Sequence, residues 1–269
     1  MCKVLNVARS GYYAWRKRPL SKLERSNQEL LGMIQKVFQT SRRTYGSPRI
    51  HAHLRRNGWI CGHNRVARLM RTHKIVARAR RRRYPITTQR QPGVIPAPNL
   101  LNRNFYAEWP NQKWVTDITY IDTAEGWLYL ASVLDLYSRK VVGWAMSEQI
   151  DSSLTASALH MACITRRPQV GLIHHSDQGR QFTSIAYQQI LKGMGCQVSM
   201  SSVGNCYDNA VMESFFATLK AECVTEQYAT REEARRSIFD YLEGWYNRQR
   251  LHSALGYLNP TEFEAQSGH

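Results

Sequence analysis

Three carboxylates stand in chemically distinctive segments of the chain: Asp117, Asp177 and Glu213. Asp117 lies in a β-rich run, Asp177 follows an apolar stretch at the start of a polar turn, and Glu213 falls on an apolar-periodic helix. Thirty-five residues separate Asp177 from Glu213. Carboxylate oxygens that converge from a strand, a turn and a helix are the ligands that Mg2+ requires. Two such ions activate a nucleophile and stabilise the leaving oxygen in phosphodiester chemistry.

The elements that must position these carboxylates follow a regular order. Three β-rich runs are followed by helix, strand, helix, strand and helix, an order typical of a ribonuclease-H-like fold. We therefore expect an α/β catalytic core with a mixed five-stranded sheet and helices. The expected strands are 113–121, 127–134, 140–146, 170–174 and 197–200, and the expected helices are 152–166, 185–194, 209–222 and 231–246.

The charge is divided unevenly along the 269 residues. Residues 1–108 hold 24 Lys and Arg against 3 Asp and Glu, whereas residues 109–269 hold 13 against 17. A basic arm joined to a mildly acidic domain indicates a polyanion that one part holds and the other processes. Nucleic acid is the favoured partner. An anionic membrane surface is second, but no long basic amphipathic stretch or apolar span supports it.

The first part of the chain is all-helical with helix-turn-helix spacing. A helix is expected at 23–40, and two shorter helices follow Pro48 and Gly58. The segment from His63 to His73 is the expected recognition helix. Arg65, Arg68 and Arg71 lie about one turn apart on one face and are candidate DNA contacts. A helix with exposed arginines in a small helical domain is the alternative explanation.

A basic, Pro-containing linker separates the two parts. Residues 78–83 contain five arginines, and we expect this stretch to follow DNA phosphates without reading sequence. The candidate contacts in it are Arg80, Arg81, Arg82 and Arg83. The expected organisation is a helix-turn-helix DNA-binding region (1–77), the linker (78–108), the catalytic core (109–228) and a C-terminal helical extension (229–269).

Cysteine and histidine usage argues against a zinc module. The six cysteines form no CxxC pair, and the nine histidines have no metal-ligand spacing. No signal peptide is recognised, so we expect a cytoplasmic, reduced protein that associates with the nucleoid when bound to DNA.

Several motifs together carry a family resemblance. They are Gln112–Tyr120 (QKWVTDITY), Leu134–Arg139 (LDLYSR), His175–Gly179 (HSDQG), Tyr207–Phe216 (YDNAVMESFF), Tyr246–Arg248 (YNR) and Leu251–Tyr257 (LHSALGY). In this order and spacing, the chain resembles the transposases of the insertion sequence 3 family, specifically their second-frame catalytic product, within the retroviral-integrase superfamily. The resemblance covers nearly the whole chain.

The resemblance implies a function and a set of partners. The family's acidic triad falls on Asp117, Asp177 and Glu213, which would bind two Mg2+ or Mn2+ ions. The implied activity is that of a DDE transposase: it binds the terminal inverted repeats of an insertion sequence in double-stranded DNA, cleaves their 3′ ends and joins them to target DNA. The implied assembly is a homo-oligomer, a dimer or larger. Residues 1–18 look like a helix-turn-helix cut short at Met1, so we expect an upstream partner or fusion segment.

Other polar residues compete for roles at the site. We expect Asp135 to pair with Arg139, Asp208 to cap the third helix of the core, and Glu222 to point away from Glu213. Lys220 shares the face of Glu213 and is a candidate phosphate contact, although an exposed lysine explains it equally well. Arg180 is a further candidate DNA contact.

Three further expectations concern the surroundings of the triad. His174 and His175 are expected to have a structural or supporting role. Trp114, Trp127 and Trp144 are expected in the core rather than as base-stacking platforms. The polar stretch 199–207, with Gly204, is expected to close over the scissile strand.

Two functions compete with a transposase. A repressor or an inactive remnant would use the basic half alone, but three carboxylates without metal would repel phosphate. A structure-selective nuclease of the same fold is the other alternative, and the helix-turn-helix favours recognition of defined ends instead.

Overall fold

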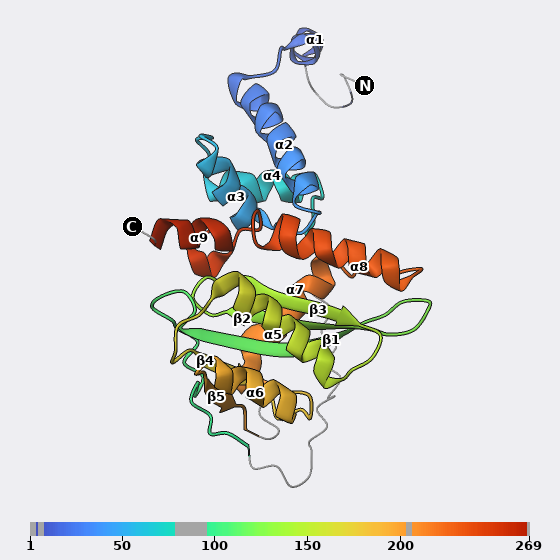
Figure 1. Cartoon of the computed structure of the whole chain (residues 1–269). Helices are drawn as coiled ribbons and strands as arrows, with labels where there is room; N and C mark the ends of the chain where they lie inside the picture. Colours follow the sequence, from blue (N-terminus) through green and yellow to red (C-terminus); the bar gives the residue numbers. More distant parts are fainter. Residues whose placement is uncertain (1–3, 5–7, 79–95, 203–205, 268–269) are drawn as a thin grey trace. The chain divides into compact units, whose positions relative to one another are not determined.

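The chain divides into two compact units, Met1–Ala77 and Arg78–His269. The computed structural model describes residues 4, 8–78, 96–202 and 206–267 (Figure 1). The four-part division expected from the sequence stays a prediction. No helix among the described residues is long and apolar enough to cross a membrane.

The described part of the N-terminal unit contains four helices, which include the three that the sequence analysis expected after residue 22. They are α1 (Arg9–Lys17), α2 (Lys22–Thr40), α3 (Ser47–Arg56) and α4 (His63–Thr72). The start of α2 is fixed by a capping box, in which the Ser21 hydroxyl accepts from the Glu24 backbone N–H and the Glu24 carboxylate accepts from that of Ser21. Pro48 lies in the first turn of α3. The apolar faces of α2, α3 and α4 are buried, with Ile34, Ile50, Leu54 and Val66 inaccessible to solvent.

The second unit contains the expected mixed sheet of five strands, in the order β3-β2-β1-β4-β5. The strands are β1 (Lys113–Ile121), β2 (Leu128–Asp135), β3 (Val141–Ser147), β4 (Ile173–Ser176) and β5 (Gln197–Met200). The pairs β1–β2 and β2–β3 are antiparallel, and β1–β4 and β4–β5 are parallel. The expected strand at 170–174 starts three residues later, because Gly171 has a positive φ of 96° and belongs to a turn.

Helices pack on the sheet and extend beyond it. They are α5 (Ser152–Arg166), α6 (Ile185–Gly193), α7 (Ala210–Glu222), α8 (Arg231–Phe239) and α9 (Pro260–Ser267). The helix expected at 231–246 leaves the α-helical form at Asp240, and residues Asp240–Tyr246 form a π-helical turn. The tail beyond it ends in α9, which lies within the helical extension expected at 229–269 although the sequence analysis gave this helix no bounds.

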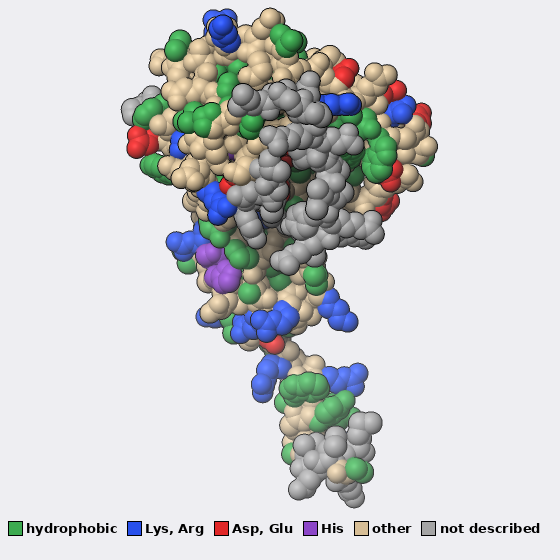
Figure 2. All heavy atoms as spheres, turned by 90° about the horizontal axis from the view of Figure 1, so that it is seen from below, with side chains coloured by type: hydrophobic (Ala, Val, Ile, Leu, Met, Phe, Trp, Pro, Cys, Tyr) green, Lys and Arg blue, Asp and Glu red, His purple; other side chains and the backbone are tan. Residues whose placement is uncertain are grey.

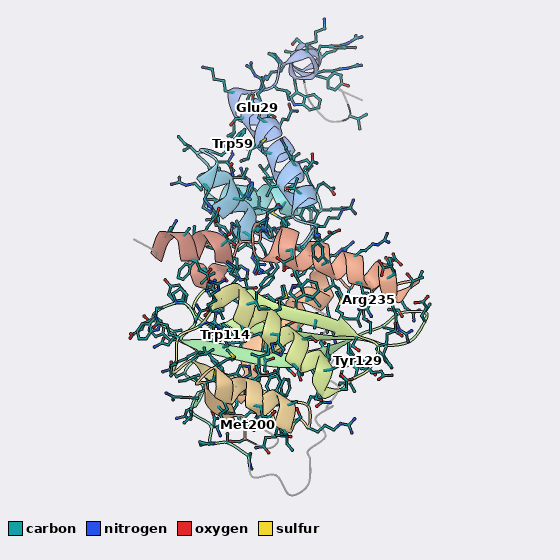
Figure 3. The ribbon with its side chains drawn as sticks, viewed as in Figure 1. Glu29, Trp59, Trp114, Tyr129, Met200 and Arg235 are labelled. Carbon is teal, nitrogen blue, oxygen red and sulfur yellow. The ribbon has the colours of Figure 1, made fainter. Side chains whose placement is uncertain are left out.

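The two faces of the sheet carry different partners (Figures 1 and 3). One core cluster joins Trp114, Ala131 and Val133 of the strands to residues of α5 and α6. Because successive strand residues point to opposite faces, Val115 and Asp117 must face the other side, where α7 contacts β1. Gly143 lets α5 approach β3, since a Cβ there would collide with the Ala158 carbonyl oxygen.

Candidate active site

Asp117 and Asp177 are brought together by strand pairing. In the parallel ladder, Val115 of β1 is the partner of His175 of β4. Asp117 lies two residues beyond Val115, and Asp177 lies two residues beyond His175. Neighbouring strands run about 5 Å apart, so the two aspartates leave adjacent strands at the same level.

Glu213 approaches from the helix side. It lies in the first turn of α7, the helix that contacts β1 on the face of Asp117. Its negative charge is close enough to Asp117 to raise the pKa of that carboxyl. Of the three residues expected in the triad, the structure therefore brings Asp177 and Glu213 into electrostatic range of Asp117.

The electrostatics of this group are those of crowded like charges. Burial raises the pKa of Asp117 well above its ordinary value, and the charge of Asp177 raises it further. The Ile118 backbone N–H and the cation of Lys220 oppose that shift. Burial also raises the pKa of Glu213. Such a cluster gains most from a bound cation, which removes the repulsion.

Short backbone contacts orient the two aspartates. Oδ1 of Asp117 accepts from the Ile118 backbone N–H at 2.7 Å. Oδ1 of Asp177 accepts from the Gly179 N–H at 2.9 Å. A Cβ at position 179 would lie only 2.9 Å from Asp177 Oδ1 and 3.0 Å from Gln181 Oε1. A larger residue at position 179 would therefore force the side chains of Asp177 and Gln181 to shift.

The donor chemistry of the site fits a hard divalent cation. The three candidate ligands offer only carboxylate oxygens, as Mg2+ and Mn2+ prefer. Among the described residues, no three His, Cys, Asp or Glu side chains are already spaced as the ligands of one ion.

Lys220 lies near the carboxylates. It is on α7, two turns beyond Glu213, and is partly buried. Burial lowers its pKa, and the charge of Asp117 opposes that effect. An ordinary exposed lysine does not have these properties, so the position fits a cation that faces a phosphate at the site.

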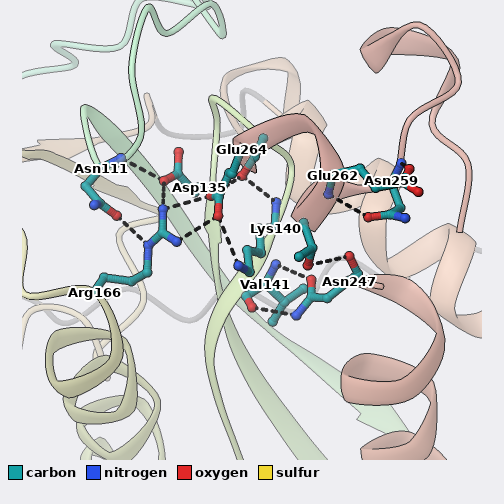
Figure 4. Close-up of polar contacts among 11 residues, drawn as sticks. Asn111, Asp135, Lys140, Val141, Arg166, Asn247, Asn259, Glu262 and Glu264 are labelled. Atoms are coloured by element: carbon teal, nitrogen blue, oxygen red, sulfur yellow. Dashed lines mark hydrogen bonds and ion pairs between the residues drawn. The ribbon is translucent and has the colours of Figure 1, made fainter. Parts of the chain in front are cut away.

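Asp135 does not pair with Arg139, contrary to the expectation. Its carboxylate accepts from the backbone N–H groups of Asn111 and Tyr137 and lies 3.3 Å from Nη2 of Arg166 (Figure 4). Arg139 sits in the turn with φ of 60° and donates to the Phe105 carbonyl oxygen. Arg166, the last residue of α5, is thus the ionic partner of Asp135 in place of Arg139.

Asp208 is not the helix cap expected from its position. Residues Cys206–Asn209 form a 3-10 turn, so α7 begins at Ala210 and Asn209 occupies the cap position. The Asp208 carboxylate instead accepts from Asn99 Nδ2, Arg103 Nε and the Ser202 N–H. Burial would raise the pKa of Asp208, but these bonds outweigh it and lower the pKa.

Glu222 belongs to a separate buried ion pair. It lies 2.8 Å from Arg250 and also accepts from Tyr241 Oη and Trp245 Nε1. The side chains of Glu222 and Arg250 are 6% and 4% exposed. The expectation that Glu222 points away from Glu213 agrees with these contacts. The Tyr-Asn-Arg region of the sequence therefore carries a structural cation, Arg250, which the sequence analysis did not identify.

The two histidines before Asp177 are buried and neutral, in agreement with a structural role. Burial lowers the pKa of His174 to about 3 and that of His175 to about 4. His174 Nε2 lies 3.1 Å from Tyr187 Oη, and His175 Nδ1 lies 2.8 Å from Ser199 Oγ. These contacts join β4 to α6 and β5, and so hold the strand that delivers Asp177.

One of the three tryptophans is not in the core. Trp114 is fully buried and Trp144 is half-buried, with its Nε1 donating to Glu243. Trp127 precedes β2 in a turn and is 51% exposed, because the strand begins one residue later than expected. Its ring packs edge-on against Tyr120.

The expected DNA contacts lie in different environments. Arg65 of α4 donates to Asn27 Oδ1 and Ser26 Oγ of α2, both at 2.8 Å, and so braces two helices. Arg68, Arg71 and Arg180 are exposed. On the face shown in Figure 2, Lys and Arg side chains are frequent over the N-terminal helices and acidic ones are rare. The candidates in 80–83 and Gly204 lie outside the described residues.

Two amides beside the triad were missed by the sequence analysis. Asn209 Nδ2 donates to the Thr116 carbonyl oxygen at 3.4 Å, and its buried Oδ1 has no partner among the described residues. Gln178 Nε2 donates to the Ser201 carbonyl oxygen, and the buried Gln178 Oε1 likewise has no partner among the described residues. The available signal was position: Gln178 follows Asp177 directly, and Asn209 precedes Glu213 by one helical turn.

Comparisons with known proteins agree with this arrangement. The family described as Integrase core domain matches residues 107–206, and a second family of that description matches residues 194–260. An HTH-like domain matches residues 25–83. The helix-turn-helix region and the α/β fold class expected from the sequence are thereby confirmed.

Full-length relatives are found among insertion-element proteins. The chain is 44% identical to the Insertion element IS600 uncharacterized 31 kDa protein of Shigella sonnei, over 98% of this chain and 97% of that protein. It is 43% identical to Transposase InsF for insertion sequence IS3A of Escherichia coli K12, over 98% and 92%. A solved structure, the HTLV-2 integrase catalytic core domain in complex with magnesium, is similar over 59% of this chain and 99% of its own, with 16% identity and a TM-score of 0.45.

Proposed function

Because the chain belongs to the insertion sequence 3 family of transposases, we propose that it binds the terminal inverted repeats of an insertion sequence, cleaves their 3′ ends and transfers them to target DNA. The observation that carries the proposal is the convergence of Asp117, Asp177 and Glu213 from β1, the end of β4 and α7. A transposase with an integrase core is a polynucleotidyl transferase, and a group of converging carboxylates is what metal-dependent chemistry of that kind requires.

Asp117, Asp177 and Glu213 are the residues that would hold Mg2+ or Mn2+, two ions per site. Bound ions of this kind supply an activated oxygen nucleophile and neutralise charge on the leaving oxygen. The chain's own contribution is to hold the three carboxylates on rigid elements. Lys220, beside Asp117, is placed to pair with a DNA phosphate, which fixes the strand relative to the carboxylates.

DNA recognition is assigned to the basic first part of the chain. Arg68 and Arg71, which are exposed on α4, are proposed DNA contacts. Arg65, one turn before Arg68, is also a proposed contact and in addition holds α4 on α2. Arg80, Arg81, Arg82 and Arg83 of the linker and Arg180 near the Asp177 turn are proposed phosphate contacts. Binding should weaken steeply as salt rises, because each neutralised phosphate releases counterions.

Pairing of two element ends requires at least two active sites, so we propose a dimer or larger homo-oligomer in a synaptic complex. Size measured by light scattering with and without paired end DNA tests the assembly; a chain that stays monomeric while joining ends contradicts it.

The test of the function is incubation of the protein with end-labelled terminal repeats and Mn2+. Nicked and joined strands on a denaturing gel, dependent on the metal, are the expected result. Binding of the ends without any cleaved product would favour the alternative, a DNA-binding repressor or an inactive remnant. Cleavage of unrelated branched DNA with equal efficiency would favour a structure-selective nuclease.

A further inference from the structure

The entrance to α7 is held by a buried carboxylate that has no part in the triad. Asp208 is 2% exposed. Its Oδ2 accepts from Asn99 Nδ2 and from the Ser202 N–H, both at 3.0 Å, and its Oδ1 accepts from Arg103 Nε at 3.1 Å. We call these three contacts the Asp208 clasp. They connect two segments that lie about a hundred residues apart in the sequence.

The segment that supplies Asn99 and Arg103 is itself fixed to the edge of the sheet. The Met200 N–H donates to the Pro98 carbonyl oxygen. Ser199 Oγ accepts from the backbone N–H groups of Leu100 and Leu101, at 2.9 and 3.2 Å. Both acceptor positions of this hydroxyl are thus occupied, so its proton is directed to His175 Nδ1. The end of the linker is therefore built into the frame of the core.

The next residue, Asn209, connects the start of α7 to β1, the strand that carries Asp117. The Gln112 carbonyl oxygen accepts from Ile173 of β4, so by strand alternation the Thr116 carbonyl points to the same side. The β1–β4 ladder ends at Val115, and Asn209 Nδ2 donates to the Thr116 carbonyl beyond it. Asn209 precedes Glu213 by four residues, so both lie on one face of the first helical turn.

We propose that Asp208 is a positioning residue, which fixes the start of α7 against the linker end and thereby places Glu213 opposite Asp117 and Asp177. The inference rests on the proposed function of these three carboxylates. Its physical reason is that like charges repel, so Glu213 stays near the two aspartates in the metal-free protein only if its helix is held by other contacts. Asp208 supplies them from the scaffold.

The consequence is a dependence of metal affinity on residues that bind no metal. Asp208→Asn keeps the shape of the side chain but removes the charge and turns one acceptor into a donor. We expect Mn2+ affinity of the full chain to fall by about 10- to 100-fold, the usual effect of a residue that orients a ligand. Electron paramagnetic resonance of free Mn2+ measures this directly, without any turnover. Strand transfer should recover at high Mn2+, because the ligands themselves are intact.

A second variant keeps the test decisive if Asp208→Asn does not fold. The side chain of Arg103 is 56% exposed, so Arg103→Leu should leave the core intact while it removes one of the three contacts of the clasp. It should weaken Mn2+ binding less than Asp208→Asn, and the double variant should be no weaker than Asp208→Asn alone. The matched control is Glu148→Gln, which breaks an exposed 3.0 Å pair with Arg231 elsewhere in the same unit and should leave Mn2+ affinity unchanged.

Wild-type Mn2+ affinity in folded Asp208→Asn, or in Arg103→Leu where Asp208→Asn does not fold, overturns the positioning role. An equal loss in Glu148→Gln also overturns it, since the effect would not be specific to the clasp. A wild-type chain that neither binds Mn2+ nor cleaves ends overturns the proposed function, and this inference falls with it. Weaker Mn2+ binding in the clasp variants, with unchanged melting temperature and end binding, supports the inference.

Discussion

Two groups of carboxylates in the second unit have opposite electrostatic surroundings. Around Glu222 and around Asp135, arginines from distant parts of the chain neutralise the acids at 2.8 and 3.3 Å. Around Asp117, burial raises the pKa above its ordinary range, and the charges of Asp177 and Glu213 raise it further. Burial also raises the pKa of Asp135, so pairing with Arg166 reduces the cost of burying that charge without removing it, whereas the crowded acids repel one another until a cation arrives. The difference distinguishes acids that have an ionic partner from acids that repel one another, which is the arrangement expected of a candidate functional site.

The largest effect should come from the crowded group. Asp117→Asn, Asp177→Asn or Glu213→Gln should each reduce strand transfer by about a thousandfold or more. The charge stabilisation that a metal supplies is worth several kcal/mol, and each 1.4 kcal/mol is tenfold in rate. End binding in low salt, measured by gel shift, should stay within a few-fold of wild type. Substantial strand transfer by any one of these variants would refute the assignment of the triad.

The buried pair should show the opposite pattern. Arg250→Leu leaves Glu222 charged and buried, so the free energy of unfolding should fall by about 3–5 kcal/mol. Urea denaturation measures this loss. The control is Arg236→Leu, which removes an exposed partner of Glu232 and should cost less than about 1 kcal/mol. Equal losses in the two variants would remove the distinction between buried and exposed pairs.

A third group joins the C-terminal helix to the core. Glu264 of α9 accepts from Ser138, Lys140 and Arg166, at 2.7 to 3.0 Å (Figure 4). Burial would raise the pKa of Glu264, but Arg166 outweighs it and lowers the pKa. Its contribution to stability is therefore present at neutral pH and lost as pH falls through the lowered pKa.

Glu264→Gln should cost about 1–3 kcal/mol, the penalty for buried polar groups that lose a charged partner. Amide hydrogen exchange should show the loss in α9 first, because this helix is held by that carboxylate. If the amides of α9 exchange no faster than those of α5 in the Glu264→Gln variant, the Glu264 contacts do not hold α9 on the core.

The smallest effect concerns the stability of the metal-free protein. The pKa of Asp117 is higher in the folded chain than in the unfolded one, so the folded state binds its proton more tightly. Stability should therefore fall as pH rises from the ordinary aspartate range through the raised pKa. Asp117→Asn should melt higher than wild type at neutral pH and show a flatter dependence on pH. A variant that melts lower than wild type in the absence of metal would contradict the repulsion at the site.

Most secondary structure follows from local patterns in the sequence. The bounds of β1, α5 and β5 agree with the sequence prediction to the residue, because alternation and helical periodicity report which side of an element is buried. The exceptions have local causes that periodicity does not register. Gly171 delays β4, the 3-10 turn before α7 moves the cap from Asp208 to Asn209, and Trp127 falls just outside β2.

The choice of ionic partners could not be read from the sequence. Asp135 pairs with Arg166 although Arg139 is nearer in the sequence. The other two ion pairs are Glu222 with Arg250 and Asp208 with Arg103. Each pair joins residues 28 to 105 positions apart. A sequence pattern reports the burial of a residue, but the identity of its partner depends on which elements the fold places side by side.

By itself the sequence predicted the candidate acidic triad and determined the order of the elements and the basic character of the first part, because each of these depends on residue types and short-range spacing. Only the tertiary structure decided which carboxylates are neutralised and which repel one another. Long-range packing makes that difference, since an aspartate or glutamate has an ionic partner only where the fold brings an arginine or lysine beside it.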